Sequence, residues 1–377
     1  MLYISTEYFY PFSDAGGPIR SIENILQYFT KGSNICILTS SSDYNNKPLP
    51  IGYIANNIVT DKVTGHKIAY VSKYLSGLFF SFKSLKHNDI VYINGLFKPS
   101  LNLIPILISN KLIICPRGML QNNLLNQKSV IKHLYLSLLK FIFLFKNVQW
   151  HATTKQEVLE IIEVFGKQKN IKVISNIPVK PFAVYKNYVK QPQSLSLVYY
   201  GLIVENKGLL TLIQTLKTLN YPVLLDIYGS VKDQAYWKLC LQEINDNDSL
   251  STFNYKGHAN PADSQTILAS YDALVLLTKG ENFGHSIYEA LSVGTPVIIS
   301  DKTPWVFEES ATPAGWFVNY ANNKFDIDKL KQVLEALYNM DNNTYSLCSA
   351  NAHKYAVDFY NAHDFKAQYT ALFNSFN

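Results

Sequence analysis

The chain has 377 residues, of which 47% are hydrophobic and 16% charged, and its net charge is +6. This length exceeds what one hydrophobic core usually serves, so we expect two domains, and the composition excludes a disordered chain. No run approaches the roughly 20 apolar residues of a membrane-spanning helix, and the first residues lack a signal-peptide pattern.

The charge is unevenly distributed along the chain. The window from Ile90 to Gln156 contains eight Lys or Arg residues and no Asp or Glu. We therefore expect a basic surface in the first half that faces an anionic partner. The four cysteines are scattered without metal-ligand spacing, which is typical of reduced core thiols in a cytosolic protein.

Apolar strand-like runs alternate with helical patterns through the first half. The expected strands are 2–5, 34–39, 89–94, 111–115 and 171–175. The expected helices lie near 18–30, 76–86, 128–146 and 155–165.

A segment with three prolines at 176–194 interrupts this alternation and reads as a linker. Strands are expected again near 195–200, 222–228, 251–256, 272–277 and 295–300, and helices near 326–339 and 345–376. Repeated strand–helix units imply parallel sheets with right-handed crossovers. We therefore predict an α/β chain with two doubly wound domains. Their expected bounds are 1–180 and 195–360, with a linker at 181–194 and a last helix, about 361–377, that crosses back onto the first domain.

The segment E-N-F-G-H-S-I-Y-E at 281–289 lies between two apolar strands. It places Glu281 and Glu289 on either side of Gly284, where a helix is expected to start. Helix N-termini at the carboxyl ends of parallel strands bind phosphates, and carboxylates accept hydroxyl groups. The pattern predicts a site for a nucleotide sugar. Alternatively, Glu281 complements the helix dipole and Glu289 is an ordinary surface acid.

A second motif, Y-Y-G-L-I-V-E-N-K-G at 199–208, ends a strand at Gly201 and begins a helix after Lys207. A lysine at a helix N-terminus can hold a diphosphate. Alternatively, Lys207 is an exposed lysine beside a turn glycine.

From Tyr199 to about Val318, the chain resembles the donor-binding half of glycosyltransferase family four, which comprises retaining enzymes of the GT-B fold with two Rossmann-like domains facing a central cleft. The matching elements are K-G at 207–208, I-Y-G-S at 227–230, Y-K-G-H at 255–258, the 281–289 segment, G-T-P-V at 294–297, T-P-W at 303–305 and G-W-F-V at 315–318. The segments P-R-G-M-L at 116–120 and H-A-T-T-K-Q-E at 151–157 are similar to one branch of this family.

The resemblance implies roles for individual residues. Glu289 would bind the ribose hydroxyls, Glu281 the donor sugar hydroxyls and Lys207 the diphosphate. The backbone at Asn282, Phe283 and Gly284 would touch the sugar and the phosphate. Other members have a histidine where P-R-G lies here, so we expect His151, His258 and His285 to be structural or peripheral.

One position departs from the family pattern, since Leu202 stands where an arginine usually follows the strand glycine. The chain has only two arginines, Arg20 and Arg117, and both follow expected strands. We expect one or both to supply the missing cation to the donor diphosphate or to bind the acceptor, because arginine offers a bidentate fork that lysine lacks. The predicted catalytic residues are thus Glu281, Lys207 and Arg117, and the turn residues Gly16 and Gly17 join Arg20 in the donor site. The alternative is that both arginines are ordinary surface residues.

The expected helix at 128–146 is basic and otherwise almost wholly apolar. Such a helix fits docking on an anionic bilayer, which would suit a polyprenyl-diphosphate-linked acceptor. The alternative is a core helix whose lysine stripe faces water.

Together these features predict a retaining, hexosyltransferase-type glycosyltransferase that moves a sugar from a nucleotide diphosphate sugar to a glycan or lipid-linked acceptor. We expect a role in surface polysaccharide assembly, such as lipopolysaccharide or O-antigen, in the cytoplasm or peripherally on the inner face of the plasma membrane. We expect no cofactor, no metal and no nucleic-acid partner. The alternatives are a GT-B-fold nucleotide-sugar epimerase and a non-catalytic partner subunit that binds nucleotide or glycan.

Overall fold

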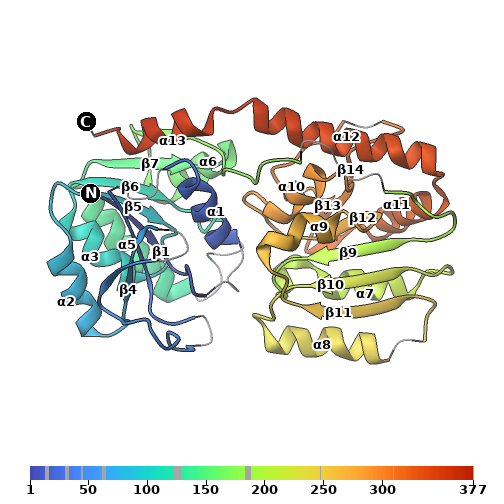
Figure 1. Ribbon diagram of the computed structural model, residues 1–377, viewed down its shortest axis with the longest axis horizontal. Helices are drawn as coiled ribbons and strands as arrows, with labels where there is room; N and C mark the ends of the chain where they lie inside the picture. The colour runs from blue at the N-terminus through green and yellow to red at the C-terminus, as the bar shows by residue number, and fades with distance from the viewer. Residues whose placement is uncertain are drawn as a thin grey trace. The chain divides into compact units, whose positions relative to one another are not determined.

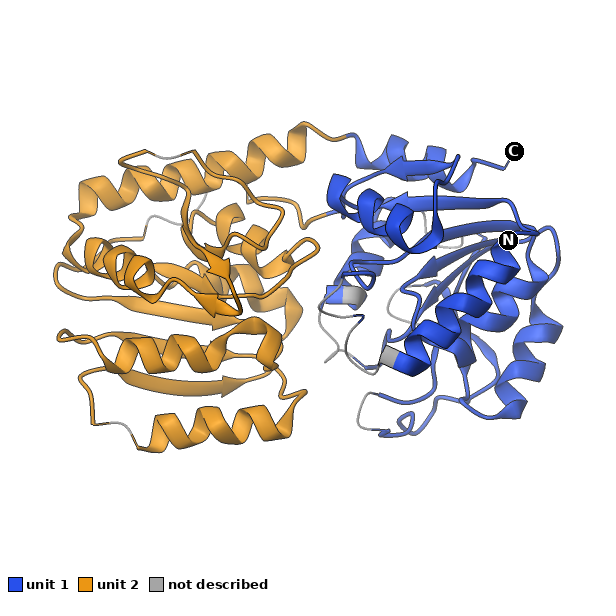
Figure 2. Ribbon diagram, turned by 180° about the vertical axis from the view of Figure 1, so that it is seen from behind, with its two compact units in different colours: residues 1–177, 364–377 blue, residues 178–363 orange. Residues whose placement is uncertain are grey.

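The computed structural model describes residues 1–12, 17–29, 34–43, 46–61, 65–121, 125, 129–182, 188–246, 248–308 and 310–376. The chain divides into two compact units, which Figure 2 shows in blue and orange. Unit 1 comprises Met1–Ile177 and Asp364–Asn377, and unit 2 comprises Pro178–His363. Each unit is built on a mainly parallel sheet covered by helices (Figure 1), so the predicted α/β class is confirmed.

The sheet of unit 1 has the strand order β3-β4-β2-β1-β5-β6-β7-β8, and only the β3–β4 pair is antiparallel. Its strands are β1 (Leu2–Thr6), β2 (Ile35–Ser40), β3 (Ile58–Thr60), β4 (Lys67–Val71), β5 (Ile90–Asn94), β6 (Lys111–Cys115), β7 (Val148–Ala152) and β8 (Ile171–Val173). The central strands β1, β2, β5 and β6 are buried along nearly their whole length because helices cover both faces of the sheet.

The helices of unit 1 are α1 (Gly17–Leu26), α2 (Leu75–Ser84), α3 (Pro99–Ile108), α5 (Ser129–Phe143), α6 (Lys155–Phe165) and α13 (Phe365–Phe373). Right-handed crossovers put α2, α3, α5 and α6 on one face of the sheet and α1 on the other, because the strand order runs one way after β1 and the opposite way after β4. Helix α13 packs on unit 1 through Tyr369, whose hydroxyl donates to Ser175 O at 3.2 Å.

The sheet of unit 2 is wholly parallel, with the order β11-β10-β9-β12-β13-β14. Its strands are β9 (Ser196–Tyr200), β10 (Leu224–Tyr228), β11 (Thr252–Gly257), β12 (Ala273–Leu276), β13 (Val297–Ser300) and β14 (Gly315–Val318). Its helices are α7 (Leu209–Lys217), α8 (Gln234–Asn245), α9 (Ser264–Leu268), α10 (His285–Ser292), α11 (Ile327–Asn339) and α12 (Asn342–Asn361). The strand order reverses between β9 and β12, which is where ligands bind in open parallel sheets.

The structure differs from the sequence prediction at several elements. Strands β4 and β7 and helix α3 were not predicted; α3 is only ten residues long, apolar on most sides and contains Pro105, so it carries no clear helical period. The single helix predicted at 345–376 was wrong. It is two helices, α12 and α13, and the chain passes from unit 2 to unit 1 between them.

The end of the predicted linker at 181–194 lies against unit 2. The Lys190 amide donates to Asn342 Oδ1 at 2.9 Å, and its buried ammonium lies 3.6 Å from Asp272 Oδ2. All four cysteines are buried and form no disulfide, as expected. In the described part of the chain, none of the helices is both long and apolar enough to cross a membrane.

Candidate active site

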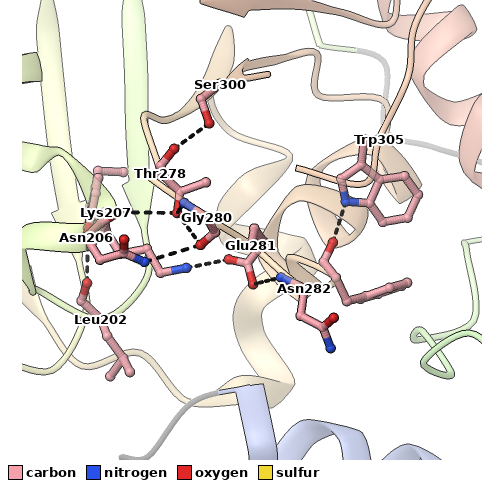
Figure 3. A network of polar contacts seen from close by, with 11 residues as sticks. Leu202, Asn206, Lys207, Thr278, Gly280, Glu281, Asn282, Ser300 and Trp305 are labelled. Atoms are coloured by element: carbon pink, nitrogen blue, oxygen red, sulfur yellow. Dashed lines mark hydrogen bonds and ion pairs between the residues drawn. The ribbon is translucent and has the colours of Figure 1, made fainter. Parts of the chain in front are cut away.

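Two loops meet at the carboxyl ends of the neighbouring strands β9 and β12 (Figure 3). The Lys279 amide donates to Asn206 O at 2.8 Å, and the Asn206 side-chain amide donates to Gly280 O at 3.2 Å. The Thr278 hydroxyl lies 2.8 Å from Gly280 O, and Ser300 Oγ donates to Thr278 O at 2.5 Å. These bonds fix both loops before any ligand arrives.

Lys207 and Glu281 form an ion pair across these two loops (Figure 3). Each side chain remains 18% exposed, so water and ligands can reach the pair. The second carboxylate oxygen of Glu281 accepts the Asn282 amide at 3.1 Å. The structure thus brings together two predicted site residues that are 74 positions apart in the sequence.

Two glycines allow the two loops to lie close together, because each has a positive φ and no room for a side chain. Gly208 has φ of +67°, and a Cβ there would lie 2.1 Å from the carbonyl oxygen of Leu277. Gly284 has φ of +76°, and its Cβ would meet Ile287 at 2.7 Å. Larger residues at either position would move the loops that carry Lys207 and Glu281.

Helix α10 begins directly after Gly284, as the sequence predicted. Gly284 has no side chain with which to cap the helix, and an N-terminus without a side-chain cap can bind an anion. Glu289 lies in the second turn of α10 and is only 3% exposed.

Aromatic rings support the loop from behind. The Trp305 indole N–H donates to Phe283 O at 2.5 Å, and the two rings form a T-shaped contact with centroids 5.1 Å apart. Phe359 of α12 packs against both rings, at 6.1 and 5.1 Å. The backbone at Asn282 and Phe283 is therefore held in place by buried packing.

The predicted arginines lie in unit 1. Arg20 is in α1, and its Nη1 lies 3.7 Å from Glu23 Oε2. Arg117 follows β6 with φ of +59° and donates from Nε to Asn94 Oδ1 at 2.5 Å and from Nη2 to the Tyr92 hydroxyl at 2.9 Å. Gly17 is the first residue of α1, while Gly16 lies outside the described residues.

His151 lies in the same buried cluster as Arg117. Its Nδ1 lies 2.9 Å from the Tyr92 hydroxyl and its Nε2 lies 2.8 Å from Ile174 O. Burial, together with the nearby Arg117 charge, lowers the pKa of His151 to about 3, so the ring is neutral. This is a structural histidine, as expected.

The other two histidines contact their own unit. His258 Nδ1 lies 3.2 Å from Ser230 Oγ, and the His285 ring packs on Phe283 at 4.8 Å. Asn206, Thr278 and Ser300 were not identified from the sequence, because they act through hydrogen bonds to main-chain carbonyls, which no motif marks.

The comparisons with known proteins agree with this geometry. Residues 185–365 match the family model described as glycosyl transferases group 1. No curated protein sequence matches the chain.

Solved structures resemble the chain over almost its whole length. HepE from Anabaena, in complex with UDP and glucose, has a TM-score of 0.74 at 13% identity, covering 99% of both chains. Sucrose-phosphate synthase from Thermosynechococcus elongatus has a TM-score of 0.73 at 14% identity, covering 99% of this chain and 98% of that one. WaaG, a glycosyltransferase involved in lipopolysaccharide biosynthesis, has a TM-score of 0.66 at 15% identity, covering 99% and 100%.

At these identities the structural likeness establishes the fold, and the predicted GT-B architecture of two Rossmann-like domains is confirmed. The family match adds the class of enzyme, since it covers the strands and loops that carry Lys207, Glu281 and Glu289. The chain is a glycosyltransferase of GT-B fold, and its residues 185–365 match the model described as glycosyl transferases group 1.

Proposed function

We propose that the chain transfers a hexosyl group from a nucleoside diphosphate sugar to an acceptor hydroxyl, with retention of the anomeric configuration. The observation that carries the proposal is the partly exposed Lys207–Glu281 pair beside the N-terminus of α10, at the point where the strand order reverses. Two similar structures were solved with such ligands: HepE with UDP-glucose, and a trehalose-6-phosphate protein from E. coli with UDP-2-fluoro glucose.

The ion pair is the resting state of the site in this proposal. A bound diphosphate competes with Glu281 for the Lys207 ammonium, and the released carboxylate accepts hydroxyl groups of the donor sugar. The exchange leaves neither charge without a partner, because the diphosphate replaces the carboxylate at Lys207 and the sugar hydroxyls replace the ammonium at Glu281.

The reaction breaks the bond between the anomeric carbon and the diphosphate oxygen and forms one to the acceptor oxygen, whose proton leaves with the phosphate or solvent. Lys207 and the N–H groups at the start of α10 stabilise the charge that develops on the leaving diphosphate. Buried Glu289 holds the ribose hydroxyls and thereby fixes the nucleotide end of the donor. We propose that these groups act without a metal or a cofactor.

Leu202 provides no cation to the diphosphate. Of the two arginines, we propose that Arg20 supplies the second charge, because the Arg117 guanidinium already donates to Asn94 and Tyr92.

We further propose a glycan or polyprenyl-diphosphate-linked acceptor in surface polysaccharide assembly, such as lipopolysaccharide or O-antigen, at the inner face of the plasma membrane. Two observations support it: the likeness to WaaG and the basic, apolar helix α5. The domain roles follow, with acceptor binding in unit 1 and donor binding in unit 2.

Thermal unfolding with UDP-, GDP-, ADP- and CMP-sugars tests the donor site. A ligand at a hundredfold excess over its Kd adds about 2.7 kcal/mol of stability. We expect a shift with one nucleotide class that is lost in Glu289→Gln, a substitution that keeps the buried side chain's shape. Lys217→Gln, which lies in an ion pair with Glu243, is the control and should keep the shift.

Three outcomes would contradict the proposal. No shift with any nucleotide would favour a non-catalytic partner subunit. Conversion of the donor sugar without an acceptor would favour an epimerase. A product with inverted anomeric configuration, seen by NMR, would overturn retention.

A further inference from the structure

Helix α5 exposes apolar side chains along one face. Its buried face consists of Tyr135, Leu136 and Leu139. The exposed stripe continues past the end of the helix and consists of Ile131 (75% exposed), Leu134 (68%), Leu138 (45%), Phe141 (62%) and Phe145 (76%). These positions repeat every three or four residues, so they lie on the same side of the helix.

Helix α2 also exposes apolar side chains along one face, which the sequence pattern did not indicate. Leu75, Phe79 and Phe82 are 72%, 67% and 64% exposed and lie at helical spacing. The opposite face holds the buried Gly77 and Ser81, with the partly buried Phe80 packed against the core beside them. Leu75, Phe79 and Phe82 are therefore on the outer face of the helix.

Both helices belong to the same layer of unit 1. Helices α2, α3 and α5 cover one face of the sheet, and α2 packs directly on α3 (Figure 1). Lys146, just after α5, donates to the carbonyls of Leu107 and Ser109 at the end of α3, both at 2.7 Å. We call the exposed apolar residues of α2, α5 and the end of α3 the layer surface; Leu107, 47% exposed, is its contribution from α3.

The charge around the layer surface is positive. Between Lys62 and Gln156 the sequence has thirteen Lys or Arg residues and one acid, Asp89. Asp89 is buried and accepts the amino group of Met1 at 3.0 Å, so it does not offset the lysines. Lys83 and Lys140 are exposed on α2 and α5 themselves.

We propose that the layer surface docks on an anionic lipid bilayer. Exposed aromatic and aliphatic side chains enter the acyl boundary, while lysine stems lie along them and place their ammonium groups among anionic headgroups. A second copy of the chain fits less well, because a two-fold interface places each patch against itself and would bring lysines toward lysines. The inference rests on the proposed membrane location and does not depend on the proposed donor.

Flotation of the full chain with phosphatidylcholine vesicles, with and without phosphatidylglycerol, tests the proposal. We expect binding only to the anionic vesicles and a decrease with salt. Phe79→Ser with Phe82→Ser, and separately Ile131→Ser with Phe141→Ser, should each weaken binding at least about tenfold, since each pair removes two large apolar side chains from the bilayer. Leu239→Ser with Leu347→Ser, which are 49% and 57% exposed in unit 2, should leave binding unchanged.

Thermal stabilisation by the donor nucleotide, measured on the same variants, reports an intact fold and is independent of vesicle binding. The proposal is overturned if the wild type does not float with anionic vesicles at low salt, or if the α2 and α5 variants float as well as the wild type. It is also overturned if sedimentation velocity shows a dimer that the same substitutions dissociate, which would assign the layer surface to a second copy.

Discussion

The carboxyl ends of the two parallel sheets carry similar residues and use them differently. In unit 2, Lys207 pairs with Glu281, and both remain partly exposed on glycine-bearing loops. In unit 1, Arg117 donates to Asn94 and to Tyr92, which also contacts His151, in a cluster covered by α13. Both sets of residues lie where ligands bind in parallel sheets.

The difference shows that a charged residue at a strand end is not by itself a ligand site. A side chain can bind a ligand only if its partners are weak enough, or accessible enough, to be exchanged. The Lys207–Glu281 pair meets this condition because solvent reaches both groups. The Arg117 cluster does not, since opening it would leave buried polar groups without partners.

The largest effect is expected for Lys207→Met. It removes the cation that we assign to the leaving diphosphate, so kcat/KM should fall about 100-fold or more, with little change in melting temperature. The measurement is sugar transfer from the donor that stabilises the wild type. Lys217→Met, which breaks an ion pair away from the strand ends, should retain activity. Near wild-type transfer by Lys207→Met would contradict the claim that the Lys207–Glu281 pair of unit 2 binds the donor.

Arg117→Met should lower the stability of unit 1 and leave binding of the donor nucleotide unchanged. It leaves the Asn94 carbonyl and the Tyr92 hydroxyl without their donor in a buried site, so unit 1 should lose about 3 kcal/mol. Hydrogen exchange of β5 and β6 measures the loss. Arg20→Met should cost about 0.5 kcal/mol, because its ion pair is long. If Arg117→Met kept its stability but lost the nucleotide-induced shift, Arg117 would belong to the donor site after all.

A smaller effect follows from the lowered pKa of His151. The folded state holds the ring neutral down to about pH 3, while an unfolded histidine takes up a proton near pH 6.5. The unfolded state therefore binds more protons below pH 6.5, and stability falls as the pH falls. Between pH 7 and pH 5 this group should cost about 2 kcal/mol.

Urea titrations at both pH values, followed by hydrogen exchange of β7, check this expectation. The variant His151→Gln should be less stable at pH 7 but should lose about 2 kcal/mol less on acidification. His353→Gln, at an exposed site, should behave as the wild type. An unchanged pH dependence in His151→Gln would mean that the folded state does not lower the pKa of this ring.

The loops of the candidate site could be predicted from the sequence because their signals are local. Each loop combines the end of a strand, a glycine and the start of a helix within about ten residues. This pattern marks Gly208 and Gly284, and Lys207 and Glu281 lie beside them. The hydrogen bonds that Arg117 makes within unit 1 could not be predicted in this way. Its partners Asn94 and Tyr92 lie 23 and 25 residues away, and only the parallel register of β5 with β6, in which Asn94 is opposite Cys115, brings them together.

The layer surface shows a second limit of prediction from the sequence. The helical spacing of Leu75, Phe79 and Phe82 is the same as that of a core stripe, and periodicity does not say which face is buried. In the structure the buried face of α2 holds Gly77 and Ser81, and Gly77 lies against Ser72 with no room for a Cβ. That contact joins a helix to the preceding loop, and the sequence pattern alone does not contain it.

The placement of α13 has a consequence for how the enzyme is synthesised. Unit 1 needs Asp364–Asn377, yet the whole of unit 2, Pro178–His363, is translated first. At about 5 to 20 residues per second, this interval lasts roughly 10 to 40 s. During that time Tyr92 and His151 lack the rings of Phe373 and Tyr369 that cover them in the finished protein. The first domain to leave the ribosome is therefore the last to be completed, and α13 can pack on unit 1 only after all of unit 2 has been synthesised.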